Sequence, residues 1–232
     1  MTDLEVEFEN IDKGDHIFSD DLKECYFDDE ETEEIMDNSI QIVKLTIGDF
    51  KQYFVREEVA GKVITNIYIP HITSEGGGLL RTVLQVLYPV YKQQVKANKI
   101  YLWAGELIGK KPSGKTLWAR LGFMARKREN VETVLNYGLG NGLIQKKTYE
   151  KFCDEKTRLL KTNTPFPFPM SYIYVLKNGK QMLEEAPYLK ENRFDGWAGE
   201  LNLKPRKKIE QKMLRRFIIF IDKLYKRKDK RM

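Results

Sequence analysis

The stretch IPHITSEGGGLLRTVLQVL, from Ile69 to Leu87, places three consecutive glycines between an apolar run and a segment of helical character. Apolar residues from Leu80 to Tyr91 recur every three to four positions, as on one face of a helix. Pro89 falls inside that segment and is expected to kink or shorten the helix, because proline lacks a backbone N–H. The glycines therefore form a loop that enters a helix.

Strand patterns flank this loop on both sides. SIQIVKLTI and KQYFVREEVAGKVITNIYIPHI are rich in Val, Ile, Tyr and Phe, with Ala60-Gly61 as the predicted hairpin turn, and KIYLWA follows the helix. Ser113 is a candidate cap for a short helix through Leu121, which Gly122 ends. Residues 130–160 look mostly helical with a break at GLGNG, and SYIYVL from Ser171 resembles a strand. We expect an α+β fold with a mixed, mostly antiparallel central sheet flanked by helices.

A glycine loop between a strand and a helix is suited to a phosphate. Its backbone N–H groups lie at the positive end of the helix dipole, and the missing Cβ atoms let a ligand approach the chain. The spacing is not G-x-G-x-x-G, so a dinucleotide-binding fold is disfavoured. By itself the loop is either a pyrophosphate site or only a turn.

Several motifs follow one another in a familiar order. Pro70 precedes the loop, Gly76 and Gly78 fall at two glycine positions, and LWARLGF places Trp118 four residues before Gly122-Phe123. With the strands and helices between them, these motifs resemble the core of the GNAT superfamily of acyl-CoA-dependent N-acyltransferases. The resemblance covers about residues 40–125, roughly a third of the chain.

The resemblance implies an acyl-CoA site, with acetyl-CoA as the expected cofactor and an unidentified amine as the acceptor. Splaying of the predicted strands 63–69 and 100–103 would admit the pantetheine arm. Amine acylation needs a group that accepts the amine proton, for which His71 and Glu106 are the candidates. The expected cofactor-binding residues are Thr73, Gly76, Gly77, Gly78, Leu79 and Leu80.

Three positions depart from the family pattern. Thr73 replaces the usual Gln or Arg of the family, and Trp118 stands where a catalytic Tyr often occurs. Lys111 stands roughly where the family often has an Asn. A second hypothesis is therefore a catalytically inactive GNAT-like binding or structural protein, of virus type or an assembly component. Such a protein would engage nucleic acid or a protein partner and need no cofactor.

A third hypothesis is an NTP-binding protein. GKKPSGKT, residues 109–116, matches the P-loop pattern, and FIIFID ending at Asp222 resembles the strand that carries a magnesium-binding Asp. The helix after Lys115 is short for this fold. Under both the P-loop and the GNAT hypotheses, the candidates for phosphate contact are Lys110, Lys111 and Lys115. Under the GNAT hypothesis they would contact the CoA 3′-phosphate.

Composition excludes several classes. Cys25 and Cys153 are too few for a disulfide scaffold or a thiolate zinc site, and with His16 and His71 the only histidines, a histidine-rich metal centre is excluded. A carboxylate metal site stays open, although we expect no metal. No apolar run reaches the roughly 18 residues that a membrane span needs, so we expect an intracellular protein, cytoplasmic or within a viral assembly.

Charge divides the chain into three predicted parts. Residues 1–40 contain 2 Lys/Arg against 16 Asp/Glu, and the remainder contains 38 against 18. We expect an acidic arm over 1–38, a GNAT-like domain over 39–203, and a basic amphipathic helix over 204–232 that offers nonspecific contact with nucleic acid. The arm either stays solvated, folds onto the protein's own basic surface, or competes there with a polyanion.

Overall fold

The fold is known from a computed structural model of the chain. It describes residues 6–25, 27–48, 50–70, 79–105, 114–153, 167–188 and 196–228, except the side chains of 79–83 and 222–228. The α+β class predicted from the sequence is confirmed, because these residues form mostly antiparallel strands flanked by helices. Among the helices described, none has the length and apolar character needed to cross a bilayer.

The chain forms two compact units. The first comprises Met1–Trp103 with Leu201–Met232, and the second comprises Ala104–Glu200. This division differs from the predicted arm, domain and terminal helix, because the first unit includes both ends of the chain. Its strands lie in the order β1-β2-β3-β4-β5, antiparallel except for the parallel pair β4 and β5.

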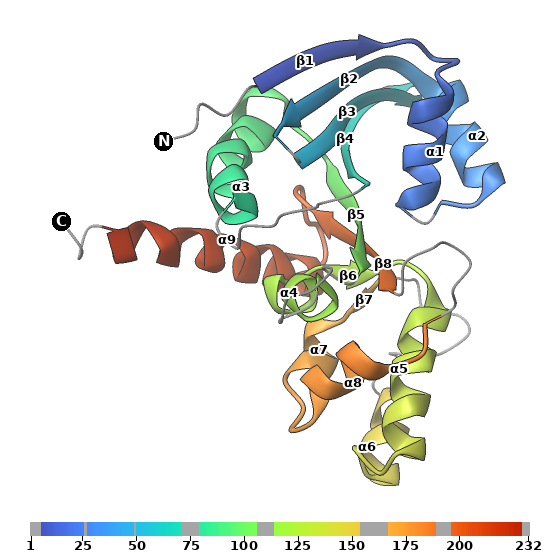
Figure 1. Cartoon of the computed structure of the whole chain (residues 1–232), viewed down its shortest axis with the longest axis vertical. Helices are drawn as coiled ribbons and strands as arrows, with labels where there is room; N and C mark the ends of the chain where they lie inside the picture. The colour runs from blue at the N-terminus through green and yellow to red at the C-terminus, as the bar shows by residue number, and fades with distance from the viewer. Residues whose placement is uncertain are drawn as a thin grey trace. The chain divides into compact units, whose positions relative to one another are not determined.

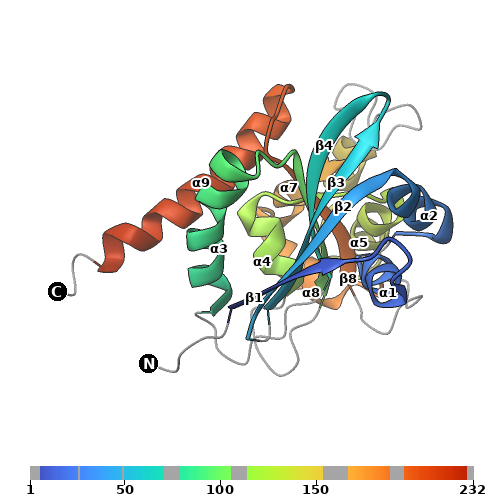
Figure 2. The same cartoon turned by 90° about the horizontal axis from the view of Figure 1, so that it is seen from above.

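Helices cover both faces of the strands of the first unit (Figures 1 and 2). Figures 1 and 2 show α1 and α2 on one side of its strands and α3 with α9 on the other. The elements are β1 Val6–Ile11, α1 His16–Glu24, α2 Asp29–Asn38, β2 Ser39–Ile47, β3 Phe50–Val59, β4 Lys62–Ile69, α3 Leu79–Pro89, the π-helix η1 Val90–Gln94, β5 Lys99–Gly105 and α9 Lys208–Lys228.

The acidic N-terminal segment belongs to the core of this unit. Where an arm is predicted, the structure has the edge strand β1 and the helices α1 and α2, and apolar side chains of the helical region pack against the sheet. Burial of each large side chain stabilises the fold by roughly 1.5–3 kcal/mol relative to leaving it exposed, which favours docking of this charged segment on the sheet. The core cluster comprises Phe18, Leu22, Cys25, Phe27 and Ile35 from this segment with Ile42, Tyr53, Val55 and Tyr68 from the strands.

Acidic residues of the segment also start its two helices. The Asp15 side chain accepts a hydrogen bond of 2.7 Å from the backbone N–H of Ile17 and caps α1. At α2, Asp28 and Glu31 form a capping box, with Glu31 N–H donating to Asp28 Oδ1 at 2.9 Å. Carboxylates at these positions satisfy free N–H groups and complement the helix dipole. Part of the acidity therefore has a structural role.

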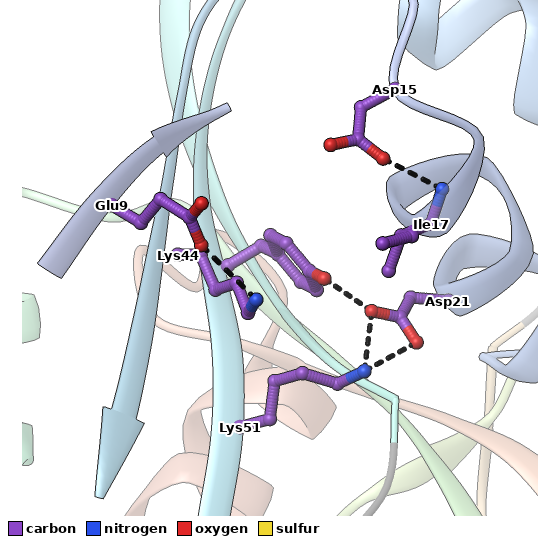
Figure 3. A network of polar contacts seen from close by, with 7 residues as sticks. Glu9, Asp15, Ile17, Asp21, Lys44 and Lys51 are labelled. Atoms are coloured by element: carbon purple, nitrogen blue, oxygen red, sulfur yellow. Dashed lines mark hydrogen bonds and ion pairs between the residues drawn. The ribbon is translucent and has the colours of Figure 1, made fainter. Parts of the chain in front are cut away.

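Asp21 fastens α1 to the sheet. Figure 3 shows its carboxylate facing Lys51 of β3, whose Nζ lies 2.7 Å away. Lys51 Nζ lies 2.7 Å from both carboxylate oxygens of Asp21, and the Tyr53 hydroxyl donates a hydrogen bond to Oδ2. Burial raises the pKa of Tyr53, and the hydrogen bond to Asp21 raises it further, so the hydroxyl stays protonated. A buried carboxylate is tolerated here because both oxygens have partners.

The predicted helix after the glycines is confirmed and begins at Leu79. Beyond Pro89 the backbone continues as η1, in which Val95 N–H donates to Val90 O, five residues earlier. The predicted amphipathic C-terminal helix is also confirmed as α9, and it packs on α3 through Phe217 and Tyr88, whose ring centroids lie 5.6 Å apart. Met213, Phe217 and Ile221 form its buried stripe.

The second unit is mostly helical, and its strands lie in the order β8-β6-β7. The predicted helical region with a break is confirmed for the described residues, since α5 and α6 flank a turn with Gly142 at φ 66°. The strand predicted from Ser171 is wrong, because packing against α4 and α8 selects a helix there. The elements are α4 Gly114–Leu121, β6 Met124–Ala125, α5 Arg128–Gly140, α6 Lys146–Cys153, β7 Phe168–Pro169, α7 Ser171–Tyr174, α8 Gly179–Glu185 and β8 Gly196–Asn202.

We predict that Asp21→Ala lowers the free energy of unfolding by about 1–3 kcal/mol, because the hydroxyl of Tyr53, 1% exposed, loses its acceptor. Urea denaturation followed by circular dichroism measures the change. The control is Glu9→Ala, which removes the exposed Glu9–Lys44 ion pair and should cost about 0–1 kcal/mol. Equal effects of the two variants would contradict a special role for Asp21.

Candidate functional site

Most of the site predicted from the glycine loop lies outside the described residues. This applies to both catalytic candidates, His71 and Glu106, to Thr73 and the glycines 76–78, and to Lys110 and Lys111. Leu79 and Leu80 form the first turn of α3, of which the backbone alone is described. Helix α3 therefore begins at the residue that follows Gly78.

Lys115 and Thr116, the residues central to the P-loop hypothesis, face α8. Lys115 is fully buried, its Nζ donates to the backbone oxygen of Glu184 at 3.2 Å, and it lies 5.0 Å from the ring centroid of Tyr188. Thr116 Oγ1 lies 3.5 Å from Glu184 Oε1. These contacts occupy Lys115, so its placement does not suit phosphate contact. Residues 208–228, which include the supposed strand ending at Asp222, form helix α9.

The parallel strands β4 and β5 are paired rather than splayed over the residues expected to diverge. Asn66 is opposite Lys99, and the pairing continues to Ile69 opposite Leu102. The expectation of an opening along 63–69 and 100–103 is therefore wrong, because backbone hydrogen bonds hold these segments together. Any divergence of the strands begins beyond Ile69 and Leu102.

A small pocket lies beside this parallel pair, on the side covered by α1 and α2. Its volume is about 230 Å³, and we call it the Glu57 pocket. The polar and aromatic residues that line it are Phe27, Glu31, Glu34 and Asn38 from the α2 region, Glu57 of β3, Asn66 and Tyr68 of β4, and Tyr101 of β5.

Strand register brings these side chains together. The β3–β4 hairpin pairs Glu57 with Ile64 and Val55 with Asn66, so Glu57 and Asn66 are diagonal neighbours on one face. The β4–β5 pair aligns Tyr68 with Tyr101 on that same face. Ala60 and Gly61 occupy the turn with φ of 50° and 70°, which confirms the predicted hairpin.

Glu57 is a buried carboxylate held by two donors. It is 5% exposed, and its Oε1 accepts hydrogen bonds of 2.9 Å from both Asn66 Nδ2 and the Tyr68 hydroxyl. Burial raises the pKa of the Glu57 carboxyl above its ordinary value, and the nearby charge of Glu34 raises it further, while the two hydrogen bonds oppose this. Burial also raises the pKa of Tyr68, which keeps its hydroxyl a donor.

Asn66 carries a buried acceptor next to Glu57. Its Nδ2 donates to Glu57, which fixes the orientation of the amide and leaves Oδ1 as the other polar atom. Asn66 is 5% exposed, and Oδ1 has no hydrogen-bond partner within the described part of the chain. A buried oxygen without a partner costs stability, so the position fits one that a bound donor completes.

Three aromatic rings form the wall of the pocket. The rings of Tyr68 and Tyr101 are stacked with centroids 5.1 Å apart, and Phe27 meets both edge-on at 5.5 and 5.4 Å. Lys99 Nζ lies 5.5 Å from the centroid of Tyr101, so this cluster already accommodates one cation. The wall combines low polarity with affinity for positive charge.

The sequence patterns did not identify Glu57, Asn66, Tyr68 or Tyr101 as site residues. A signal was present, because the predicted turn at Ala60-Gly61 and the alternation of side chains along strands place Glu57 and Asn66 on one face. Across the described residues, no three His, Cys, Asp or Glu side chains are grouped to hold a metal ion.

Comparison with protein-family models gives no match, and comparison with curated proteins gives none. Among solved structures, the chain is similar to one described as the crystal structure of PH1933 from Pyrococcus horikoshii OT3. The identity is 18%, the TM-score is 0.24, and the match covers 53% of this chain and 91% of that chain. A TM-score of this size supports no conclusion about fold or function.

We predict that Glu57→Gln raises the melting temperature at neutral pH. The amide oxygen keeps both hydrogen bonds to Oε1, whereas the desolvated charge is removed. Because the folded-state pKa is raised, the native protein binds the proton more tightly than the unfolded chain, and wild-type stability falls as pH rises from about 4.5 through the folded pKa. The advantage of the variant should therefore shrink toward pH 4.

Differential scanning fluorimetry between pH 4 and pH 8 measures this difference. The control is Glu58→Gln, the adjacent and exposed glutamate of β3, which changes charge equally without relieving burial. A melting temperature of Glu57→Gln below that of the wild type across this range would contradict the prediction.

Proposed function

We propose that this chain is an acyl-CoA-dependent N-acyltransferase of the GNAT type, with acetyl-CoA as donor and an amine as acceptor. The acceptor occupies the Glu57 pocket. The observation that carries the proposal is a buried carboxylate with a raised pKa beside a parallel strand pair, in a unit whose element order agrees with the resemblance seen in the sequence.

The arrangement of β4, α3 and β5 supports the donor side of the proposal. These three elements form a crossover between parallel strands, and α3 begins immediately after Gly78. The glycines 76–78 and the first turn of α3 would hold the pyrophosphate, because N–H groups at a helix start are free to bind anions. Acyl-CoA would supply an activated thioester.

The acceptor chemistry assigns a role to Glu57. A protonated amine cannot attack a carbonyl, so its proton must leave before the carbon–nitrogen bond forms and the carbon–sulfur bond breaks. Glu57 accepts that proton directly or through the Tyr68 hydroxyl with which it is hydrogen-bonded. The nitrogen loses a second proton as the carbon–sulfur bond breaks. One of the two protons reaches the departing thiolate and the other leaves to solvent, so the products are an amide, free CoA and one proton. A raised carboxyl pKa favours the transfer to Glu57 near neutral pH.

We predict that acetyl-CoA binds the wild-type protein and that Gly78→Glu abolishes binding, because a carboxylate would occupy the phosphate position. Isothermal titration calorimetry measures both. The matched control is Gly14→Glu, which adds the same charge at a site where a Cβ meets nothing within 4 Å, and it should bind as the wild type does. If the wild-type protein is folded but does not bind acetyl-CoA, the proposed function is contradicted.

A second function, nonspecific polyanion binding, is favoured by the segment that leads into α9. Six cationic side chains are exposed from that segment into the first turns of α9: Lys204, Arg206, Lys207, Lys208, Lys212 and Arg215. Phosphate contacts by such residues release counterions and produce strong salt dependence without base specificity. This function requires no catalysis and agrees with an inactive GNAT-like protein.

We predict for this second function that duplex DNA binds with an affinity that falls steeply with salt. The double variant Lys207→Ala/Lys208→Ala should reduce the slope of log affinity against log salt by about 2, roughly one unit for each lost phosphate contact. Fluorescence anisotropy measures the slope. Lys146→Ala/Lys147→Ala, on exposed positions of α6, is the control, and an equal loss there would contradict a specific role for the segment.

A further inference from the structure

The charges that line the Glu57 pocket are acidic. Glu57 lies buried at its base, Glu31 is half-buried, and Glu34 is exposed at its rim. Repulsion from Glu34 contributes to the raised pKa of Glu57, so the two carboxylates interact. Charges of one sign held this close favour a ligand of the opposite sign, and more than one carboxylate favours more than one positive charge.

The positions of the carboxylates are fixed by the fold. Glu31 is anchored because its Oε2 accepts from Asp28 N–H at 3.3 Å in the capping box of α2. Glu57 is anchored by Asn66 and Tyr68. The pocket is thus organised before a ligand arrives, which lowers the entropic cost of binding.

Asn66 Oδ1 provides an independent indication of the ligand. It is a buried acceptor without a partner among the described residues, and it lies beside the carboxylate of Glu57. An ammonium group has three N–H donors and no acceptor. Such a group at the base of the pocket would satisfy Oδ1 and Glu57 together, which an anion or a carbonyl compound cannot do.

Apolar side chains and aromatic rings complete the lining. Ile35, Val59 and Ile64 border the pocket together with Tyr68 and Tyr101. Methylene groups bury favourably against such surfaces, and the faces of the rings attract cations. A ligand with positive charges separated by a short aliphatic chain matches this combination.

From this lining we infer that the Glu57 pocket binds a linear di- or polyamine. One ammonium group lies against Glu57 and Asn66, a second lies toward Glu31 and Glu34, and methylenes span the apolar wall between them. Its assignment as the acceptor in acyl transfer rests on the proposed function. Binding itself does not depend on acyl-CoA.

The test is isothermal titration calorimetry of the full chain with putrescine and spermidine, without acyl-CoA. Both should bind, and butylamine, which has the chain length of putrescine but one charge, should bind at least about fivefold more weakly. Equal binding of butylamine and putrescine, or displacement of spermidine by magnesium chloride at equal concentration, would overturn the inference.

Two variants locate the site. Glu57→Gln should weaken spermidine binding by about tenfold or more, because a buried charged hydrogen bond is lost. Glu34→Gln, at an exposed position where folding is not at risk, should weaken it by about two- to fivefold. Glu58→Gln should bind as the wild type does. Wild-type affinity in both pocket variants would overturn the assignment.

Adding acetyl-CoA separates this inference from the proposed function. Spermidine binding without formation of acetylspermidine or free CoA would support the polyamine site and contradict the proposed acyltransferase activity. Acetylation of a neutral aromatic amine without any binding of spermidine would support the proposed acyltransferase activity and overturn the inference of a polyamine site.

Discussion

The two-residue turn between β3 and β4 determines which side chains of these strands face α1 and α2. Ala60 and Gly61 both have positive φ, at 50° and 70°, which matches the twist of the strands that they join. Because side chains alternate along a strand, a slip of one residue would turn Glu57 and Asn66 to the opposite face. The pocket, its hydrogen bonds and its aromatic wall all depend on this register.

Two buried carboxylates with different surroundings lie between the sheet and its covering helices, Asp21 on α1 and Glu57 on β3. Asp21 has a cation and a hydroxyl as partners, and its contacts join α1 to β3. Glu57 has two neutral donors and no cation among its described contacts, and the neighbouring Asn66 keeps an oxygen without a partner. Unbalanced polar groups of this kind reduce stability, and proteins retain them chiefly where binding or catalysis uses them. This contrast singles out Glu57.

Local sequence patterns correctly predicted the elements in which intrinsic propensity and tertiary packing favour the same secondary structure. The segment SIQIVKLTI is β2 without change of boundary, and Gly122, at φ 99°, follows the end of α4 as expected. Long-range packing decided the remainder. SYIYVL has strand composition yet begins with helix α7, and the high charge of residues 1–38 obscured the apolar side chains that pack in the core. Glu57 and Asn66 lie nine residues apart on separate strands, and only pairing unites them.

Strand β1 lies at the edge of the sheet, and its acidic residues affect whether it pairs with other chains. An edge strand offers unsatisfied N–H and C=O groups, and Val6 and Phe8 of β1 are exposed, 54% and 69% respectively. Strands of this kind recruit other chains unless charge prevents it. Glu7 and Glu9 alternate with those apolar residues and repel an identical strand. The charge of this strand therefore opposes self-association through the edge of the sheet.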